Sequence, residues 1–149
     1  MATLPIYKES LSLLTDLYEL TMAYSYWKVG VANREAVFAV FFREHPFQGG
    51  YTVAAGLESI LEWIESLQFT EDDRSYLGGL NGNDGKALFD TEFLDYLGGM
   101  KFVCDLDAVP EGTVVFPRQP LVRVTGPILQ CQILETAILN LFNFQSLIA

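Results

Sequence analysis

The chain has 149 residues, which is the length of one domain or slightly more. Apolar residues make up 50% of it and charged residues 19%, and a chain with this much apolar surface collapses, so intrinsic disorder is excluded. The formal net charge is −10, from 9 basic and 19 acidic residues. A nucleic-acid face and a basic membrane-surface helix both need an excess of Lys and Arg, so neither is expected.

The cysteines, the first residues and the last segment all favour a cytosolic protein. Cys104 and Cys131 lack CxxC spacing and His45 is the one histidine, so neither a disulfide framework nor a zinc site is predicted. Residues 1–10 show no basic region followed by an apolar core, so no secretory signal is expected. Segment 126–149 is long enough to span a membrane, but its glutamate and several Asn and Gln residues favour a buried helix of a soluble protein.

A helix is predicted near the start of the chain. Asp16 and Glu19 have the spacing of a capping box, in which carboxylates face the positive end of a helix. The pattern of residues 17–28 continues with helical spacing, and Gly30 is a plausible stop. We therefore expect a helix that begins with a carboxylate cap and ends before Gly30.

The next part of the chain predicts two strands and a second helix. Segment 36–43 is apolar on both alternating faces, and such a strand must be covered on both sides. Residues 45–50 form a turn that leads into a short strand at 51–55. Residues 57–67 carry apolar side chains at helical spacing, with glutamates on the opposite face.

The middle of the chain, residues 71–99, is polar and rich in glycine. We expect short helices at 72–77 and 91–97, joined by a mobile loop at 78–86. Three strand candidates punctuated by proline follow, and we interpret them as a small sheet folded back on itself. They are residues 101–105, 113–116 and 121–125.

The last element is a helix that starts with Pro127 at its first position. It continues to Ala149 without a glycine, a proline or a basic last turn, so its end would leave apolar side chains exposed. We therefore expect the sequence to be an N-terminal part of a longer protein. A natural end that docks in a groove stays open as the alternative.

Few motifs point to chemistry. A G-x-S-x-G elbow is missing, and we interpret His45 as a loop residue without a catalytic role. Residues 49–56 are rich in glycine but lack P-loop spacing, so a tight turn before a strand is favoured over a phosphate loop. The acidic run 71–73 could bind a divalent cation, but a solvated helix start is favoured. The aromatic residues of segment 18–27 are interpreted as core.

Four motifs, taken in order, resemble one family. They are LLTDLYELTMAYSYW (13–27), FAVFFREHPFQGGYTVAAGLE (38–58), PEGTVVFPRQPLVRVTGP (110–127) and QILETAILNLFNFQSLIA (132–149). Together they resemble the N-terminal part of nicotinate phosphoribosyltransferase, and the similarity weakens only across residues 71–97.

This resemblance implies an α/β fold, namely the α+β N-terminal domain of a type II phosphoribosyltransferase whose irregular α/β barrel is mostly missing. It implies a domain at 1–126 and, at 127–149, the start of the helix that leads into the barrel. The complete enzyme of the family joins nicotinate to 5-phosphoribosyl 1-diphosphate to give nicotinate mononucleotide and diphosphate, in NAD biosynthesis. It uses Mg²⁺ and couples the reaction to ATP hydrolysis through a phosphohistidine. It works as a cytosolic homodimer whose active sites are shared between subunits.

The resemblance carries few functional residues onto this chain. Tyr18 matches the tyrosine that stacks on the pyridine ring from across the dimer, although an ordinary core tyrosine is the alternative. Asp16 is expected to cap the helix and to orient Tyr18. Arg43 could face a phosphate or the nicotinate carboxylate, and a structural salt bridge is at least as compatible with its position.

The family's catalytic residues are not expected in this sequence. The phosphohistidine and the ribose-phosphate ligands lie beyond Ala149, and His45 does not match that histidine. The chain alone is therefore expected to bind no cofactor, to hold no metal and to have no turnover. Two alternatives remain open: a relative that uses nicotinamide or quinolinate, and a non-catalytic short form that binds or regulates full-length chains.

Overall fold

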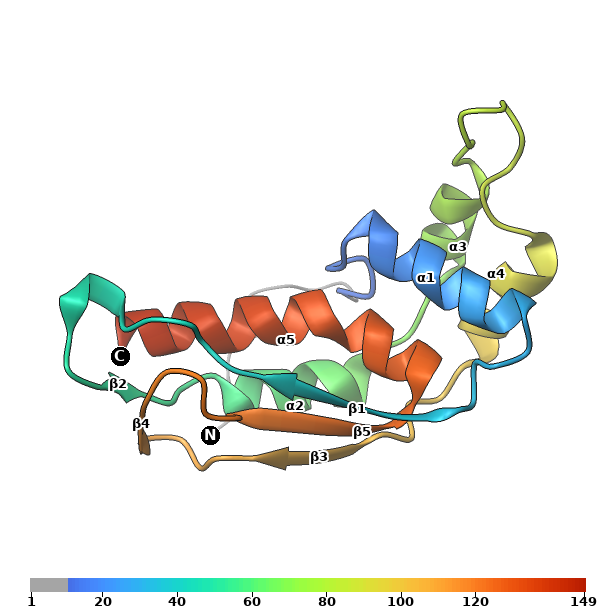
Figure 1. Ribbon diagram of the computed structural model, residues 1–149. Helices are drawn as coiled ribbons and strands as arrows, with labels where there is room; N and C mark the ends of the chain where they lie inside the picture. Colours follow the sequence, from blue (N-terminus) through green and yellow to red (C-terminus); the bar gives the residue numbers. More distant parts are fainter. Residues whose placement is uncertain (1–10) are drawn as a thin grey trace.

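The structure is a computed structural model that describes residues 11–149. Residues 1–10, for which no secretory signal is predicted, lie outside the described residues. Helices and strands are mixed, which confirms the expected α+β character (Figure 1). The elements in chain order are α1 (Leu17–Lys28), β1 (Glu35–Val40), the 3-10 turn η1 (Pro46–Gln48), β2 (Thr52–Val53), α2 (Leu57–Ser66), α3 (Glu71–Gly78), α4 (Thr91–Gly99), β3 (Asp105–Ala108), β4 (Val114–Val115), β5 (Val122–Pro127) and α5 (Ile128–Ile148).

The main sheet has three antiparallel strands in the order β1-β5-β3. Phe38 pairs with Val124, which in turn pairs with Leu106, so apolar residues of all three strands lie in one row. A second sheet consists of β2 and β4. The predicted small sheet within residues 101–125 is confirmed in part, because β3 pairs with β5. It is not a separate sheet, however: β5 also pairs with β1, and β4 pairs with β2, so both strands take partners from the first half of the chain.

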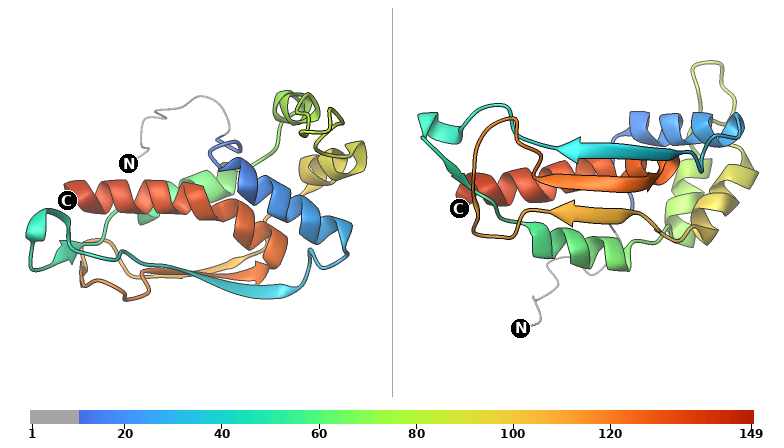
Figure 2. Two further views of the ribbon diagram at one scale, coloured as in Figure 1. Left: turned by 45° about the horizontal axis from the view of Figure 1, so that its top comes forward. Right: turned by 60° about the horizontal axis from the view of Figure 1, so that its bottom comes forward.

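Helix α5 crosses one face of the main sheet, and α2 packs beside it (Figure 2). Their apolar side chains meet those of β1 and β5 in the larger of two cores. Ile60, Trp63, Val122, Val124, Leu134, Ile138 and Phe142 are buried in this core. The long helix is thus a structural part of the unit that contains the sheet. The proposed division after residue 126 stays a prediction.

The opposite face of the main sheet is open among residues 11–149. Val37, which points to this face, is 59% exposed, and Phe41 just beyond β1 is also exposed. Arg123 of β5 and Asp107 of β3 lie on the same face of the sheet. They form an ion pair with 2.8 Å between the nitrogen and the oxygen. The expectation that segment 36–43 is covered on both sides is therefore not met by the described residues, because only one layer of helices is present.

A second core lies where α1, α3 and α4 meet the first turns of α5 (Figure 1). Tyr24 and Trp27 of α1 contact Phe93 of α4, with ring centroids 5.0 and 5.7 Å apart. Phe93 is fully buried, as are Leu77 of α3 and Leu129 of α5. Tyr24 and Trp27 therefore pack against this core, as predicted, whereas Tyr18 and Tyr26 are not part of it.

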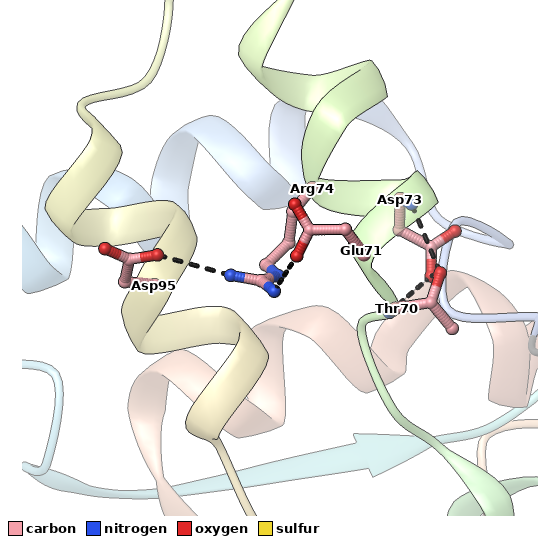
Figure 3. Close-up of polar contacts among 5 residues, drawn as sticks. All are labelled: Thr70, Glu71, Asp73, Arg74 and Asp95. Atoms are coloured by element: carbon pink, nitrogen blue, oxygen red, sulfur yellow. Dashed lines mark hydrogen bonds and ion pairs between the residues drawn. The ribbon is translucent and has the colours of Figure 1, made fainter.

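The acidic run 71–73 begins α3 and forms no cation site. Thr70 is the N-cap: its hydroxyl accepts a hydrogen bond from the Asp73 backbone N–H, and Asp73 accepts one from the Thr70 backbone N–H. Arg74 then bridges α3 to α4 through ion pairs with Glu71 and Asp95 (Figure 3). The favoured interpretation, a helix start, is confirmed.

Arg74 is expected to contribute measurably to the packing of α3 against α4. Its side chain is mostly buried between the two helices, and it contacts one carboxylate from each. Replacing Arg74 by alanine should lower the free energy of unfolding by about 1 kcal/mol, measured by urea denaturation. Lys86→Ala is the control, because Lys86 and Asp84 are both well exposed and 3.9 Å apart. Equal effects of the two substitutions would contradict this role.

Two local predictions differ from the structure. Asp16 is the N-cap residue of α1, but its side chain makes no capping hydrogen bond, so the predicted capping box is wrong. The loop predicted at 78–86 does connect α3 to α4, and it contains a turn in which the Gly82 N–H donates to the Lys86 carbonyl at 2.8 Å. Pro127 ends β5 and is the N-cap of α5 rather than its first residue.

The end of α5 agrees with its sequence. Phe144 and Ile148 are exposed, as predicted for the terminal apolar side chains. Within residues 11–149, no helix has both the length and the apolar character needed to cross a membrane.

Candidate functional site

The candidate site lies where the N-terminus of α1 meets the middle of α5. Tyr18 is in the first turn of α1, and its side chain points away from the second core, since the residue is 47% exposed. Its hydroxyl donates a hydrogen bond to Oε1 of Glu135 on α5, with 2.9 Å between the oxygens. The alternative of an ordinary core tyrosine therefore does not describe this residue. The Tyr18 ring is therefore half-exposed, and its hydroxyl is held in place by Glu135.

Two carboxylates of α1 contact the next residue of α5. Glu19 Oε1 accepts a hydrogen bond from the backbone N–H of Thr136 at 3.0 Å, and it lies within hydrogen-bond distance of the Thr136 hydroxyl, at 2.6 Å. Asp16 Oδ2 lies 3.0 Å from the same hydroxyl. Asp16 thus holds the start of α1 against α5 through Thr136 instead of through a backbone cap. The carboxylates of Asp16 and Glu19, which the sequence suggests as a helix cap, instead join α1 to α5.

Arg43, the second candidate ligand, lines a pocket that Glu135 also lines. It follows β1, and the pocket has a volume of about 590 Å³ and includes Asn143 of α5. Phe41 and Phe42 also line this pocket. Arg43 takes part in no ion pair among those found in residues 11–149. The predicted alternative of a structural salt bridge is therefore not seen in the described part of the chain.

Glu135 connects the candidate residues, and sequence reasoning did not single it out. It binds the Tyr18 hydroxyl and shares the pocket with Arg43, and its second oxygen accepts a hydrogen bond from Gln132 at 2.9 Å. The available signal was the one acidic residue in an otherwise uncharged helix, residues 128–148. A charge retained in such a helix calls for a partner.

The electrostatics of the site keep Tyr18 protonated. Partial burial, the hydrogen bond to Glu135 and the negative charge of that residue together raise the pKa of Tyr18 to about 12. Burial also raises the pKa of the Glu19 carboxyl, and hydrogen bonds from Thr136 and Thr15 offset part of this rise. Tyr18 is therefore a neutral hydrogen-bond donor with an aromatic ring, suited to binding a flat ligand rather than to nucleophilic attack.

Other groups with possible chemistry lie elsewhere. His45 packs between Phe42 and Phe116, and its Nδ1 lies 3.2 Å from the Thr52 hydroxyl. Both cysteines are free thiols, and burial raises the pKa of Cys104 to about 12. Residues 11–149 contain no group of three or more His, Cys, Asp or Glu side chains arranged to hold a metal ion.

Known proteins share both the sequence and the fold. A nicotinate phosphoribosyltransferase of Caenorhabditis elegans is 47% identical over 137 residues, which cover 92% of this chain and 24% of that protein. The nicotinate phosphoribosyltransferase of Bacillus subtilis is 43% identical over 141 residues, covering 95% of this chain and 28% of that protein. This chain thus spans between 24% and 28% of the length of these relatives.

Solved structures agree with these similarities. The crystal structure of human nicotinic acid phosphoribosyltransferase matches with a TM-score of 0.80 at 37% identity, covering 91% of this chain and 26% of that one. A nicotinate-nucleotide pyrophosphorylase from Pyrococcus furiosus shares the fold, with a TM-score of 0.56 at 19% identity.

Residues 13–143 match the family described as the nicotinate phosphoribosyltransferase (NAPRTase) N-terminal domain, and this match covers most of the chain. The chain belongs to the nicotinate phosphoribosyltransferase N-terminal domain family.

Proposed function

We propose that this chain provides one wall of the pyridine site of a nicotinate phosphoribosyltransferase. The whole enzyme would join nicotinate to 5-phosphoribosyl 1-diphosphate: the ring nitrogen bonds to the anomeric carbon, and diphosphate leaves with the electrons of the broken C–O bond. The observation that supports the proposal best is Tyr18, a half-exposed aromatic side chain in the family motif, anchored by Glu135. The product is a precursor of NAD.

The role of this wall is to position the substrate. A flat, electron-poor pyridine ring gains affinity from an aromatic face. Holding that ring in line with the anomeric carbon lowers the barrier by orientation. Arg43, exposed at the rim of the neighbouring pocket, carries the charge that would attract the nicotinate carboxylate or a phosphate. Asp16 and Thr136 hold the start of α1, on which Tyr18 lies.

We further propose that Tyr18 serves the active site of a second subunit in a cytosolic homodimer. Support comes from its exposure on the outer surface and from the open face of the main sheet. The two free thiols fit a reducing compartment.

The residues described here do not fit a Mg²⁺ site, because no acidic cluster among 11–149 has the arrangement of metal ligands. No glycine–lysine phosphate loop is present for ATP either. We therefore assign no step that involves Mg²⁺, ATP or a phosphohistidine to this chain. The resemblance attributes those steps to residues beyond Ala149.

A chimera tests the proposal directly. This chain would replace the matching segment of the Bacillus subtilis relative, which aligns over 141 residues at 43% identity. The purified chimera should form nicotinate mononucleotide from nicotinate and 5-phosphoribosyl 1-diphosphate. Nicotinamide and quinolinate, offered separately, should give far less product. A folded chimera that uses one of these instead, or that makes no product at all, would refute the assignment.

The protein of this sequence by itself is expected to show no turnover. The groups assigned here bind and orient a ring, and none of them carries phosphoryl or ribosyl transfer. Product formation would be followed by mass spectrometry, with the full-length Bacillus subtilis relative as the positive control. Nicotinate mononucleotide above the level of a protein-free blank would contradict this expectation.

A further inference from the structure

Glu19 is a buried acid for which the proposed function has no use. It is 0% exposed, in the contact between α1 and α5. Its Oε1 faces the backbone N–H and the hydroxyl of Thr136, and its Oε2 is hydrogen-bonded to the hydroxyl of Thr15. The neighbouring residue in α1 is Tyr18, so whatever holds Glu19 also holds the tyrosine ring. This makes the charge state of Glu19 important for the site.

The surroundings of Glu19 are negative. Asp16 faces it from the start of α1, and Glu135 faces it from α5, with the neutral phenol of Tyr18 between helices. None of the ion pairs in residues 11–149 includes Asp16, Glu19 or Glu135. Hydrogen bonds from Thr136 and Thr15 offset only part of the cost of burying a charged Glu19 carboxylate, whereas the neutral acid does not carry this cost.

The number of protons available for these hydrogen bonds also favours a neutral acid. The Thr136 hydroxyl lies 2.6 Å from Glu19 Oε1 and 3.0 Å from Asp16 Oδ2, but it has one proton and can donate to only one of them. If both acids were ionised, the other close contact would be between two oxygens without a proton. A proton on either acid removes the conflict. Glu19 is buried and Asp16 is exposed, so the proton is assigned to Glu19: Glu19 donates to Thr136, and Thr136 donates to Asp16.

We propose that Glu19 is a positioning residue for Tyr18 that acts as the neutral acid and holds the start of α1 against Thr136 of α5. For the reaction itself, this inference rests on the function proposed above, since it assumes that Tyr18 contacts the pyridine ring. Ionisation of Glu19 would put a third negative charge beside Asp16 and Glu135 and would loosen α1 from α5. Tyr18 would then lose its fixed position.

The stability of the contact between α1 and α5 is expected to depend on pH. Burial is the main cause that raises the pKa of the Glu19 carboxyl. An acid whose pKa is higher in the folded than in the unfolded protein stabilises the fold below the unfolded pKa. This stabilisation is lost as the pH rises through the folded pKa. The contact between α1 and α5 is therefore expected to weaken toward alkaline pH.

Carbon-13 NMR of the glutamate carboxyls in this protein, without substrate, tests the inference. The Glu19 signal, assigned by its disappearance in Glu19→Gln, should titrate above the ordinary range of exposed glutamates. The Tyr18 ring signals should move with the same midpoint. In Glu19→Gln, which keeps the shape and cannot ionise, this movement of the Tyr18 signals should vanish. Glu65→Gln, at an exposed position in α2, is the matched control and should leave the Tyr18 titration unchanged.

Two outcomes would overturn the inference: a Glu19 signal that titrates like an exposed glutamate, or a Tyr18 transition at the Glu19 midpoint that persists in Glu19→Gln. Thr136→Ser provides a second measurement. This variant keeps the hydroxyl and should retain the raised Glu19 midpoint, and an ordinary midpoint in Thr136→Ser would also contradict the inference. Because substrate is not involved, these results stand whether or not the chimera makes nicotinate mononucleotide, so the two proposals fail independently.

Discussion

Replacing Gly56 by alanine is expected to lower the free energy of unfolding by about 3 kcal/mol or more. Gly56 is the N-cap of α2 and has φ +107°, a conformation that residues with a side chain rarely adopt. A Cβ atom there would lie 2.7 Å from the Leu141 carbonyl oxygen and 3.1 Å from the Phe142 Cα. Both contacts are with the backbone of α5, which cannot move aside without leaving the main core.

Gly30→Ala is the matched control for this experiment. Gly30 also has a positive φ, +76°, but no atom lies within 4 Å of its would-be Cβ. Its replacement should cost only the left-handed strain, about 1 kcal/mol. Urea denaturation of both variants gives the comparison. Similar losses at the two positions would show that backbone strain alone matters and that α2 and α5 do not approach as closely as described.

Loss of the Tyr18 ring is expected to have the largest effect on substrate binding. In the chimera with the Bacillus subtilis relative, Tyr18→Ala should raise the KM for nicotinate about tenfold, which corresponds to ~1.4 kcal/mol of aromatic contact. Tyr18→Phe keeps the ring and loses only the hydrogen bond to Glu135, so its KM should rise much less. Steady-state kinetics at saturating 5-phosphoribosyl 1-diphosphate would measure both values.

A surface tyrosine far from the site controls for general effects of the substitution. Tyr76 of α3 is well exposed, and Tyr76→Ala should leave the KM for nicotinate unchanged. If Tyr18→Ala also leaves it unchanged while the enzyme stays folded, the ring does not contact the substrate. If Tyr18→Phe is as damaging as Tyr18→Ala, the hydrogen bond to Glu135 is the important feature rather than the aromatic face.

The elements with strong local signals were predicted well from the sequence. The helix predicted at 57–67 is observed at Leu57–Ser66, and the terminal helix differs by one residue at its start. Apolar periodicity decides these cases because each helix buries one side against the sheet. Tyr18 and Arg43 were named as candidates from the family motifs in which they lie, and their role in binding stays a prediction. The contacts that surround them could not be read from the sequence.

The pairing of distant segments could not be predicted from local patterns. The strand at 122–127 pairs with both β1 and β3, although the sequence suggested a sheet made within residues 101–125. Every strand presents unpaired backbone groups on both edges, so its own sequence does not specify which neighbour will satisfy them. The matching apolar rows, brought together under α5, make that choice.

The amino-acid sequence by itself determined the helical and extended segments, the family, and the aromatic and basic residues that are candidates for ligand binding. Only the tertiary structure decided that Asp16 and Glu19 contact Thr136 rather than cap their own helix, and that Glu135 anchors Tyr18. The physical reason is that these contacts join residues more than a hundred positions apart. Their energies depend on burial and on the sharing of protons, which exist only once α1 lies against α5.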